Sequence, residues 1–232
     1  MAKQNLEAEA AVEQFELLLK SPTGVAVSKL SEELSRLLQK TNSPDTTSLR
    51  RLAKGRWKKI IDEVAVFDQY LKYRQTSQGF VHFPMDSNTP DCWYWVSAGD
   101  SKQGIEITIA LGQTRHLVNS RLNEVGMTSG YIHASETDFK AQEREVASDP
   151  SAYSTEPALD KVTDAIISRL AAKSDARFSD LDLIIEAPLY YLAWELWDSM
   201  WPRLKSVARE LPLREVHVVG DGRTPEIGYR IK

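Results

Sequence analysis

The spacing of apolar residues changes near residue 75, and this change constrains the fold more than any other feature of the sequence. Before it, apolar side chains recur three and four positions apart, which predicts amphipathic helices. After it come short runs of β-branched and aromatic residues bounded by turn residues, which predict strands. The first three runs are GFVHFP (79–84), CWYWV (92–96) and GIEITIAL (104–111).

Three helices are predicted in the N-terminal third. The first two carry apolar stripes at Leu6, Val12, Phe15, Leu18 and Leu19, and at Val27, Leu30, Leu34, Leu37 and Leu38. Residues 21–24 (SPTG) separate them, and TNSPDTTS at 41–48 predicts a loop because it is rich in helix breakers and capping residues. The third helix is expected over residues 48–73, with a stripe at Trp57, Ile60, Ile61, Val64, Phe67 and Leu71.

Strands and helices alternate in the rest of the chain. The patterns predict helices over 113–125 (ending at Gly126), 136–147, 156–173 and 190–211, the last kinked or broken by Pro202. They predict strands over 130–134, 181–187, 215–220 and 226–232. The expected class is therefore α/β, a mixed sheet flanked by helices, with an N-terminal helical region at 1–47 and one α/β domain at 48–232.

Composition excludes several classes of protein. No apolar run approaches the roughly 20 residues of a membrane helix, and the first residues lack the apolar core of a secretory signal. The single cysteine, Cys92, rules out an intrachain disulfide and favours a reducing, cytoplasmic location. A net charge of −4 gives no generally basic surface, so contact with nucleic acid requires a local patch. Phosphate-loop, nucleophile-elbow, dinucleotide and zinc-ligand spacings are absent from the sequence.

Glu106 interrupts an isoleucine-rich run, and glutamate disfavours strands. In an extended strand, Ile105, Ile107 and Ile109 share one face and Glu106 the other, so we expect the isoleucines to pack on the helix beginning near residue 113. If 92–96 and 104–111 form a hairpin with Asp91 opposite Thr108, Asp91 and Glu106 become diagonal neighbours roughly 7–8 Å apart at Cα. Two carboxylates so placed can share one Mg²⁺.

The segment Pro90-Asp91, fourteen residues, then Glu106-Ile107-Thr108 resembles the core motif of the PD-(D/E)XK nuclease superfamily. The order of predicted elements over residues 56–187 resembles that family's restriction-endonuclease-like core: a helix, three strands, a helix and a further strand. The resemblance implies that Asp91 and Glu106 bind Mg²⁺ or Mn²⁺ and that the protein cleaves phosphodiester bonds. It also implies a glutamate on the preceding helix, a position matched by Glu63.

One position departs from the family motif. The family's lysine, two residues after the second acid, is Thr108 here, and a threonine can hydrogen-bond a water but carries no charge. Gln113 and Arg115, at the start of the next predicted helix, are candidate substitutes, and a helix N-terminus there also favours a phosphate. Thr108 and Gln113 are therefore expected to position water, and Arg115 to bind phosphate.

The segment RRLAKGRWKK (50–59) holds six basic residues in ten. It is interpreted either as a solvated helix face or as a strip that contacts phosphates just before the core. The strip consists of Arg50, Arg51, Lys54, Arg56, Lys58 and Lys59. Another group, Trp194, Trp197 and Trp201, has helical spacing that indicates core packing, with a partner-binding face as the alternative.

The sequence thus predicts a metal-dependent nuclease acting on nucleic acid, DNA in the first place. A second hypothesis, favoured by Thr108, is a catalytically silent protein of the same fold that binds DNA or a protein partner. Plainer interpretations stay open: Asp91 as a turn residue, Glu106 on an edge strand, or an enzyme on another α/β scaffold. Three alternatives stay open for the N-terminal helices: packing on the body of the protein, formation of a homodimer, or binding of a protein partner.

Overall fold

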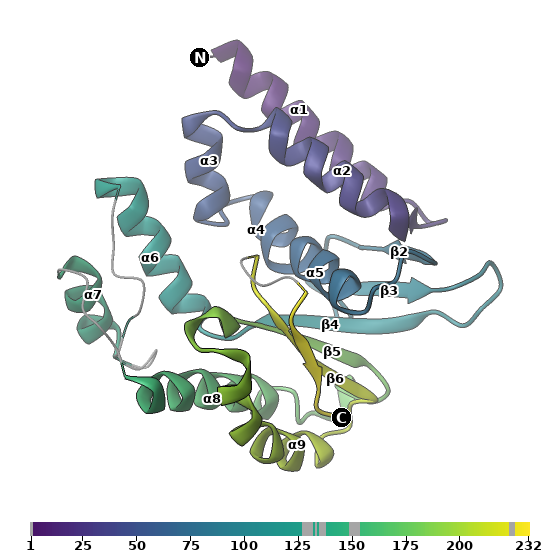
Figure 1. Ribbon diagram of the computed structural model, residues 1–232. Coiled ribbons are helices and arrows are strands. Elements are labelled where there is room, and N and C mark those ends of the chain that lie inside the picture. The colour runs from purple at the N-terminus through teal and green to yellow at the C-terminus, as the bar shows by residue number, and fades with distance from the viewer. Residues whose placement is uncertain (1, 127–131, 133, 135–137, 149–153, 223–225) are drawn as a thin grey trace.

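The computed structural model spans residues 1–232 and describes residues 2–126, 132, 134, 138–148, 154–222 and 226–232 (Figure 1). The α-helices are α1 (Ala2–Leu19), α2 (Val27–Lys40), α3 (Pro44–Arg51), α4 (Trp57–Lys59), α5 (Ala65–Tyr73), α6 (Gly112–Val125), α7 (Phe139–Ala147), α8 (Thr155–Ala171) and α9 (Trp201–Arg209). A π-helical turn, η1 (Ile60–Val64), joins α4 to α5, and short 3₁₀ turns are η2 (Ala176–Phe178), η3 (Leu189–Tyr191) and η4 (Trp194–Ser199). The predicted strand at 130–134 falls largely outside the described residues.

In the described part of the chain, seven strands form one mixed sheet in sequential order. The strands are β1 (Val25–Ala26), β2 (Phe80–His82), β3 (Cys92–Trp95), β4 (Gln103–Ile109), β5 (Asp182–Ala187), β6 (Glu215–Gly220) and β7 (Gly228–Arg230). Consecutive strands from β1 to β4 pair antiparallel, β4, β5 and β6 run parallel, and β7 pairs antiparallel with β6. The predicted α/β class with a mixed sheet is confirmed.

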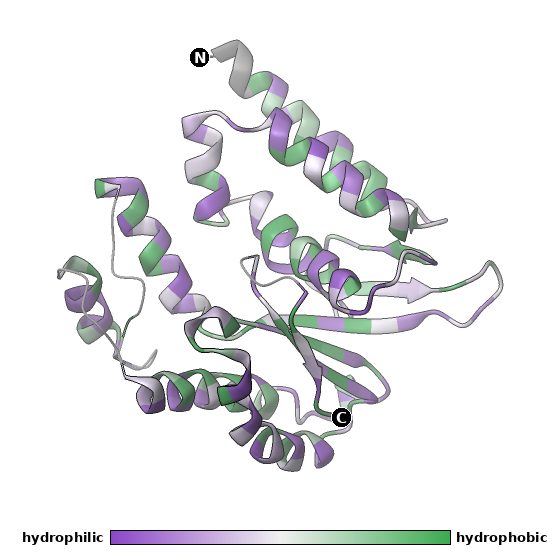
Figure 2. Ribbon diagram, in the orientation of Figure 1, coloured by the Kyte–Doolittle hydropathy of each residue, from purple (hydrophilic) through white to green (hydrophobic). Residues whose placement is uncertain are grey.

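Helices cover both faces of the sheet. Helices α1 to α5 lie on one side and α8 and α9 on the other (Figure 1). Each long helix mixes hydrophobic and hydrophilic residues along its length, as expected for a helix with one buried face (Figure 2). Two hydrophobic clusters result, one between the sheet and α1, α2, α4 and α5, the other between the sheet and α8 and α9. None of the described helices is long and apolar enough to cross a membrane.

The N-terminal helices pack on the body of their own chain. Leu19, Leu30 and Leu34 belong to the same hydrophobic cluster as Phe67 of α5, and β1, between α1 and α2, pairs with β2 at the sheet edge. The buried face of α1 differs from the predicted stripe, because Leu6 and Leu18 are exposed and Ala8 is buried beside Val12, Phe15 and Leu19.

The single helix predicted over 48–73 is wrong. Ser43 caps a new helix, accepting from the backbone N–H of Thr46 at 3.3 Å, and Pro44 begins α3 inside the predicted loop. After Arg51 the chain turns through Ala53 and Gly55, both with positive φ, before Trp57 starts the next helical segment. Most of the stripe from Trp57 to Leu71 is nevertheless buried as predicted.

The helix predicted over 190–211 is also wrong at its start. Short 3₁₀ turns occupy 189–199, and Pro202 lies in the first turn of α9, where its missing N–H costs no hydrogen bond. Trp197 and Trp201 pack in the core as expected, whereas Trp194 is partly exposed.

The facing of β4 corrects a further expectation. Ile105 and Ile107 pack with Trp57, Ile60 and Phe67, so the segment from α4 to α5 covers the isoleucines and α6 does not. Strand β4 pairs with both β3 and β5, which excludes the interpretation of Glu106 as an edge-strand residue. Glu106 therefore faces the layer of α8, buried in a central strand.

Candidate functional site

Asp91 lies immediately before β3 and caps the neighbouring strand. Its Oδ2 accepts a hydrogen bond from the backbone N–H of Ile107 at 2.7 Å. Because Cys92 pairs with Ile105, the antiparallel register continues to place Asp91 opposite Glu106, and the predicted pairing with Thr108 is wrong. The two acids are thus direct neighbours across the start of β3 rather than diagonal ones. This capping bond also gives Asp91 a more specific structural role than that of a turn residue.

Glu106 forms a buried ion pair with a residue from a distant part of the chain. Its Oε1 lies 2.6 Å from Nζ of Lys173, which follows the last turn of α8. The other carboxylate oxygen, Oε2, is buried and has no hydrogen-bond partner among the described residues. Glu106 therefore retains an acceptor that no described residue satisfies.

Glu63 projects from the π-helical turn η1, in the helical layer on the isoleucine side of β4, and interacts electrostatically with Asp91. Its Oε1 accepts from Nζ of Lys59 at 2.8 Å, and its Oε2 is another buried oxygen without a hydrogen-bond partner in the described part of the chain. Burial and the nearby charge of Asp91 raise the pKa of Glu63 to about 7. π-helical turns occur often at functional sites, because the extra residue redirects side chains.

Asp91 interacts electrostatically with both Glu63 and Glu106. Burial and the charge of Glu106 raise the pKa of Asp91 to about 6, although the hydrogen bond from Ile107 and the lysines Lys59 and Lys173 oppose that rise. Burial is the largest cause of both raised pKa values, and the nearby lysines oppose it only in part. An additional cation at this position would lower both pKa values.

The carboxylates of Asp91 and Glu106 are oxygen ligands of the kind that Mg²⁺ and Mn²⁺ take. No three acidic, histidine or cysteine side chains of the described residues converge tightly enough to form a complete metal cage. Mg²⁺, however, is commonly held by one or two carboxylates and several waters. The unpartnered oxygens of Glu63 and Glu106 are the features that favour such an ion.

A polar cleft of about 640 Å³ is lined by Glu63 but by neither Asp91 nor Glu106, and we call it the basic cleft. It lies between the turn after α3, the π-helical turn, β4 and α6. Its polar and charged lining consists of Arg51, Lys54, Lys58, Asp62, Glu63, Thr108, Arg115, His116, Asn119 and Arg169. Gly112, the first residue of α6, also lines it, so the helix N-terminus adds to the attraction for anions.

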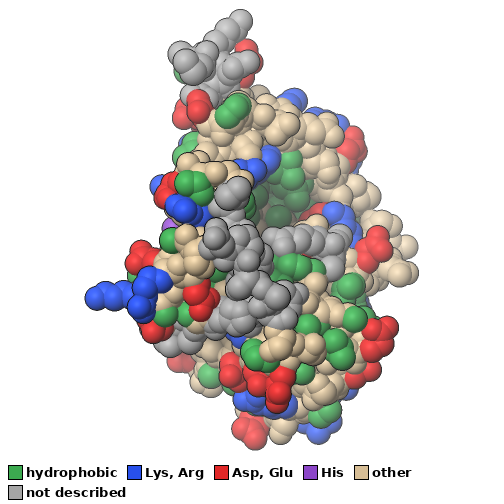
Figure 3. Space-filling view, turned by 60° about the vertical axis from the view of Figure 1, so that its left-hand side comes forward, with side chains coloured by type: hydrophobic (Ala, Val, Ile, Leu, Met, Phe, Trp, Pro, Cys, Tyr) green, Lys and Arg blue, Asp and Glu red, His purple; other side chains and the backbone are tan. Residues whose placement is uncertain are grey.

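The predicted basic strip is divided by the break in the helix. Arg51, Lys54 and Lys58 line the basic cleft. Arg50 instead donates to the carbonyl oxygen of Leu38 at 3.3 Å, Arg56 lies 3.4 Å from Glu16, and Lys59 pairs with Glu63. Over the face shown in Figure 3, basic and acidic side chains are intermixed, so the cleft and not a broad basic surface is where phosphates would gather.

Arg115 and Gln113 differ in their placement. Arg115 lines the basic cleft and pairs with two acids, contacting Asp62 through Nη2 and both carboxylate oxygens of Glu186 through Nη1 at 3.1 and 3.2 Å. Gln113 occupies the first turn of α6 but is not among the described residues that line the cleft. Thr108, by contrast, lines the cleft.

Sequence reasoning missed Lys173, Arg169, His116 and Asn119. Lys173 lies 67 residues from Glu106, and only the packing of α8 against the sheet brings the two together. Arg169 also comes from α8 and donates through Nε to the carbonyl oxygen of Ile109 at 2.8 Å. His116 and Asn119 follow Gly112 and Arg115 on one helical face, so their spacing in α6 was a usable signal.

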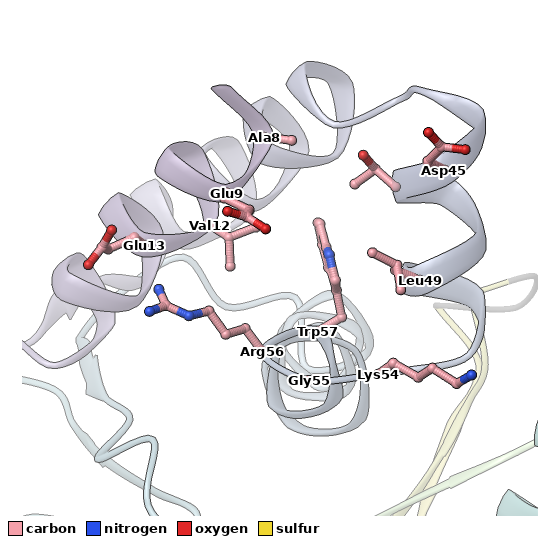
Figure 4. Close-up of a pocket in the computed structure, with 11 residues that line it drawn as sticks. Ala8, Glu9, Val12, Glu13, Asp45, Leu49, Lys54, Gly55, Arg56 and Trp57 are labelled. Atoms are coloured by element: carbon pink, nitrogen blue, oxygen red, sulfur yellow. The ribbon is translucent and has the colours of Figure 1, made fainter. Parts of the chain in front are cut away.

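A further cavity, separate from the acids, lies between α1, α3 and α4 and has a volume of about 490 Å³. The indole of Trp57 rises between α1 and α3, with Glu9 on one side and Asp45 on the other (Figure 4). Lys54 lines both this cavity and the basic cleft. No group of three potential metal ligands among the described residues occupies it.

Comparison with known proteins returned no matching family model, no matching curated protein and no matching solved structure.

Proposed function

We propose that this protein is a divalent-metal-dependent nuclease in which Asp91 and Glu106, assisted by Glu63, hold Mg²⁺ or Mn²⁺. The observation that carries the proposal is the pair of neighbouring carboxylates, Asp91 and Glu106, with a third acid, Glu63, that lines a cleft together with arginine and lysine side chains. The element order α5, β2, β3, β4, then helices α6 to α8 and β5 supports it, because Asp91, immediately before β3, lies opposite Glu106 of the antiparallel strand β4.

Different residues of the chain have different roles in the proposed phosphodiester cleavage. Arg51, Lys54 and Lys58 attract the nucleic-acid backbone into the basic cleft, and the N-terminus of α6 adds to the binding of one phosphate. The hydroxyl of Thr108 can hydrogen-bond a water or a phosphate oxygen in the cleft wall. When bound, the metal ion supplies Lewis-acid polarisation of the phosphate and a more acidic water.

Lys173 supplies a positive charge that Thr108 lacks. Its ammonium group lies 2.6 Å from Glu106, in the layer that faces the same side of β4 as Glu106 and Thr108. A positive charge there can offset negative charge developing on the phosphate. Gln113 is proposed to position water, and its location in the first turn of α6 is the one observation that supports this role.

Nucleic acid, DNA in the first place, is the proposed partner, and a cytoplasmic location is proposed because the buried, free Cys92 suits a reducing compartment. A catalytically silent nucleic-acid-binding protein is the second candidate. It is favoured by the ion pairs Lys59–Glu63 and Lys173–Glu106, in which lysines already contact two of the acids. In that case the cleft binds nucleic acid equally well with and without metal, and the nucleic acid is not cleaved.

The deciding experiment compares the wild type with Glu106→Gln and with the exposed control Glu195→Gln. Calorimetry with Mg²⁺ and Mn²⁺, run beside a plasmid-nicking assay, measures metal affinity and cleavage together. We expect the wild type and the control to bind metal and to nick DNA, and Glu106→Gln to bind metal at least about tenfold more weakly and to lose cleavage. A wild type that binds neither ion would eliminate the nuclease and leave the silent binder.

A further inference from the structure

A second cavity continues from the basic cleft, and we call it the tyrosine cavity. It has a volume of about 220 Å³ and lies at the carboxyl ends of the parallel strands β4, β5 and β6. Its lining includes Ala110 and Leu111 after β4, Ala187 and Pro188 at the end of β5, and Asp221 after β6. In α/β sheets, ligands commonly bind outside the carboxyl ends of the strands.

The tyrosine cavity and the basic cleft share one wall. Ile109, Arg115 and Asn119 line both of them, so a ligand can extend from one into the other. The cleft beyond that wall is lined by Arg51, Lys54 and Lys58 and suits phosphates. A polymer with alternating phosphates and ring systems therefore has two adjacent sites of different chemistry.

The lining of the tyrosine cavity suits a flat ring with polar edges. Tyr190 and Tyr191 contribute aromatic rings, and Val118 and Leu122 of α6 contribute apolar surface. Its volume lies below the roughly 300–1,000 Å³ of pockets for drug-sized ligands, which indicates space for a single ring system and not for a whole nucleotide. Aromatic side chains bind nucleobases by stacking.

Glu186 provides a hydrogen-bond acceptor in this wall. Its side chain is buried, and Arg115 contacts both of its carboxylate oxygens. Each carboxylate oxygen has a second lone pair, so Glu186 can accept a further hydrogen bond from an amino group. A glutamate is a recognised partner of the cytosine amino group, which neither thymine nor uracil carries.

We propose that the tyrosine cavity binds one cytosine-like, amino-bearing nucleobase of a single-stranded nucleic acid, while the neighbouring phosphates lie in the basic cleft. The inference rests on the proposed nucleic-acid partner and not on cleavage. A base within a duplex is stacked and paired, so only an unpaired base enters a cavity of this kind. The substrate class is therefore single-stranded, or a strand with an extruded base.

The experiment measures binding in the presence of a chelator, so that no cleavage intervenes. Fluorescence anisotropy gives the affinity for single strands of about ten nucleotides composed of dC, of dT, or of abasic sugar-phosphate units. We expect dC to bind about 5- to 100-fold more tightly than the abasic strand, and more tightly than dT. Equal affinity of the wild type for the dC and abasic strands would overturn the inference.

Variants locate the bound base. Tyr190→Leu removes an aromatic ring and Val118→Phe, on a partly exposed position of α6, fills the cavity; each is expected to bring dC binding down to the abasic level. Trp194→Leu, outside both cavities, is the matched control and should leave dC binding unchanged. Glu186→Gln should reduce the preference for dC over dT, because an amide presents a donor as well as an acceptor.

The outcomes separate this inference from the nuclease proposal. Selective dC binding without any metal-dependent cleavage supports the base site and rejects the nuclease. Cleavage of DNA together with equal binding of dC and abasic strands rejects the base site and leaves the nuclease standing. A dC preference that both Tyr190→Leu and Val118→Phe retain, with melting temperatures unchanged, places the base elsewhere and rejects the inference.

Discussion

Glu63 combines burial with a neighbouring negative charge, and this combination makes the stability of the protein depend on pH. Its folded-state pKa is raised to about 7 by burial first and by Asp91 second. A raised carboxyl pKa means that folding favours the protonated form. The resulting stability is fully present below the unfolded pKa, near 4.5, and is lost as the pH rises through about 7.

We therefore expect Glu63→Gln to flatten the pH dependence of unfolding. The wild type should lose stability between about pH 5 and pH 8, and the variant should lose less, by a difference on the order of 1–3 kcal/mol, because each pKa unit corresponds to about 1.4 kcal/mol. Urea denaturation at the two pH values measures this difference. Adding Mg²⁺ to the wild type should reduce the same loss, since a bound cation favours the ionised acids.

The exposed glutamate Glu195 provides the control, because its replacement by glutamine should leave the pH profile of the wild type unchanged. Parallel profiles for Glu63→Gln and the wild type would show that Glu63 is ionised throughout this range. The carboxylate group would then be compensated by Lys59 alone, and the argument for an additional cation would lose its electrostatic support.

The alternation of Glu106 with three isoleucines correctly predicted that the acid and the isoleucines occupy opposite faces. It did not predict which layer covers which face, because both helical layers present apolar stripes of similar composition. The ion pair of Glu106 with Lys173 could not be predicted from the sequence for the same reason. Local periodicity determines the facing of a side chain within its own strand, whereas the partner on that face depends on long-range packing.

Leu17 and Leu19 of helix α1 test whether its buried face contributes to stability, because they lie two positions apart and on different sides of the helix. Leu19 is 0% exposed and packs in the cluster that contains Leu30 and Phe67, whereas Leu17 is 66% exposed. We expect Leu19→Ala to cost about 2–5 kcal/mol of unfolding free energy and Leu17→Ala to change it by less than about 0.5 kcal/mol.

Chemical denaturation of the two alanine variants measures that difference. A small cost for Leu19→Ala, equal to that of Leu17→Ala, would mean that α1 is an appendage that folds independently of the sheet. The division of the chain at residue 47 stays a prediction, but the shared cluster and the pairing of β1 with β2 favour one cooperative unit.

The basic strip was predicted to be continuous because no break between α3 and α4 was expected from the sequence. The apolar stripe alone fits a single helix over 48–73, since Trp57, Ile60, Val64, Phe67 and Leu71 keep helical spacing. Ser43 and Pro44 carried a usable start signal, and Gly55 a usable stop signal. The helical propensity of the basic residues outweighed both signals in the prediction. Arg51, Lys54 and Lys58, at the turn between α3 and α4 and just after it, line the cleft.

The charge distribution of the whole molecule determines how nucleic acid reaches this cleft. The protein carries a net charge of −4, so long-range attraction of a polyanion is weak and binding depends on contacts made inside the cleft. For single strands, each phosphate contact contributes a slope of roughly 0.7 in log affinity per log unit of salt. Three cleft residues, Arg51, Lys54 and Lys58, should therefore account for a slope of about 2.

We expect the triple replacement of Arg51, Lys54 and Lys58 by glutamine to weaken single-strand binding and to reduce the salt slope by about 2. The matched control replaces Lys29, Lys40 and Arg203, three exposed basic residues outside the cleft, so that the net charge changes equally. The control should retain the wild-type slope, because those side chains contact no bound phosphate. Equal slopes for both triple variants would mean that net charge alone governs binding and that the basic cleft is not the route of the nucleic acid.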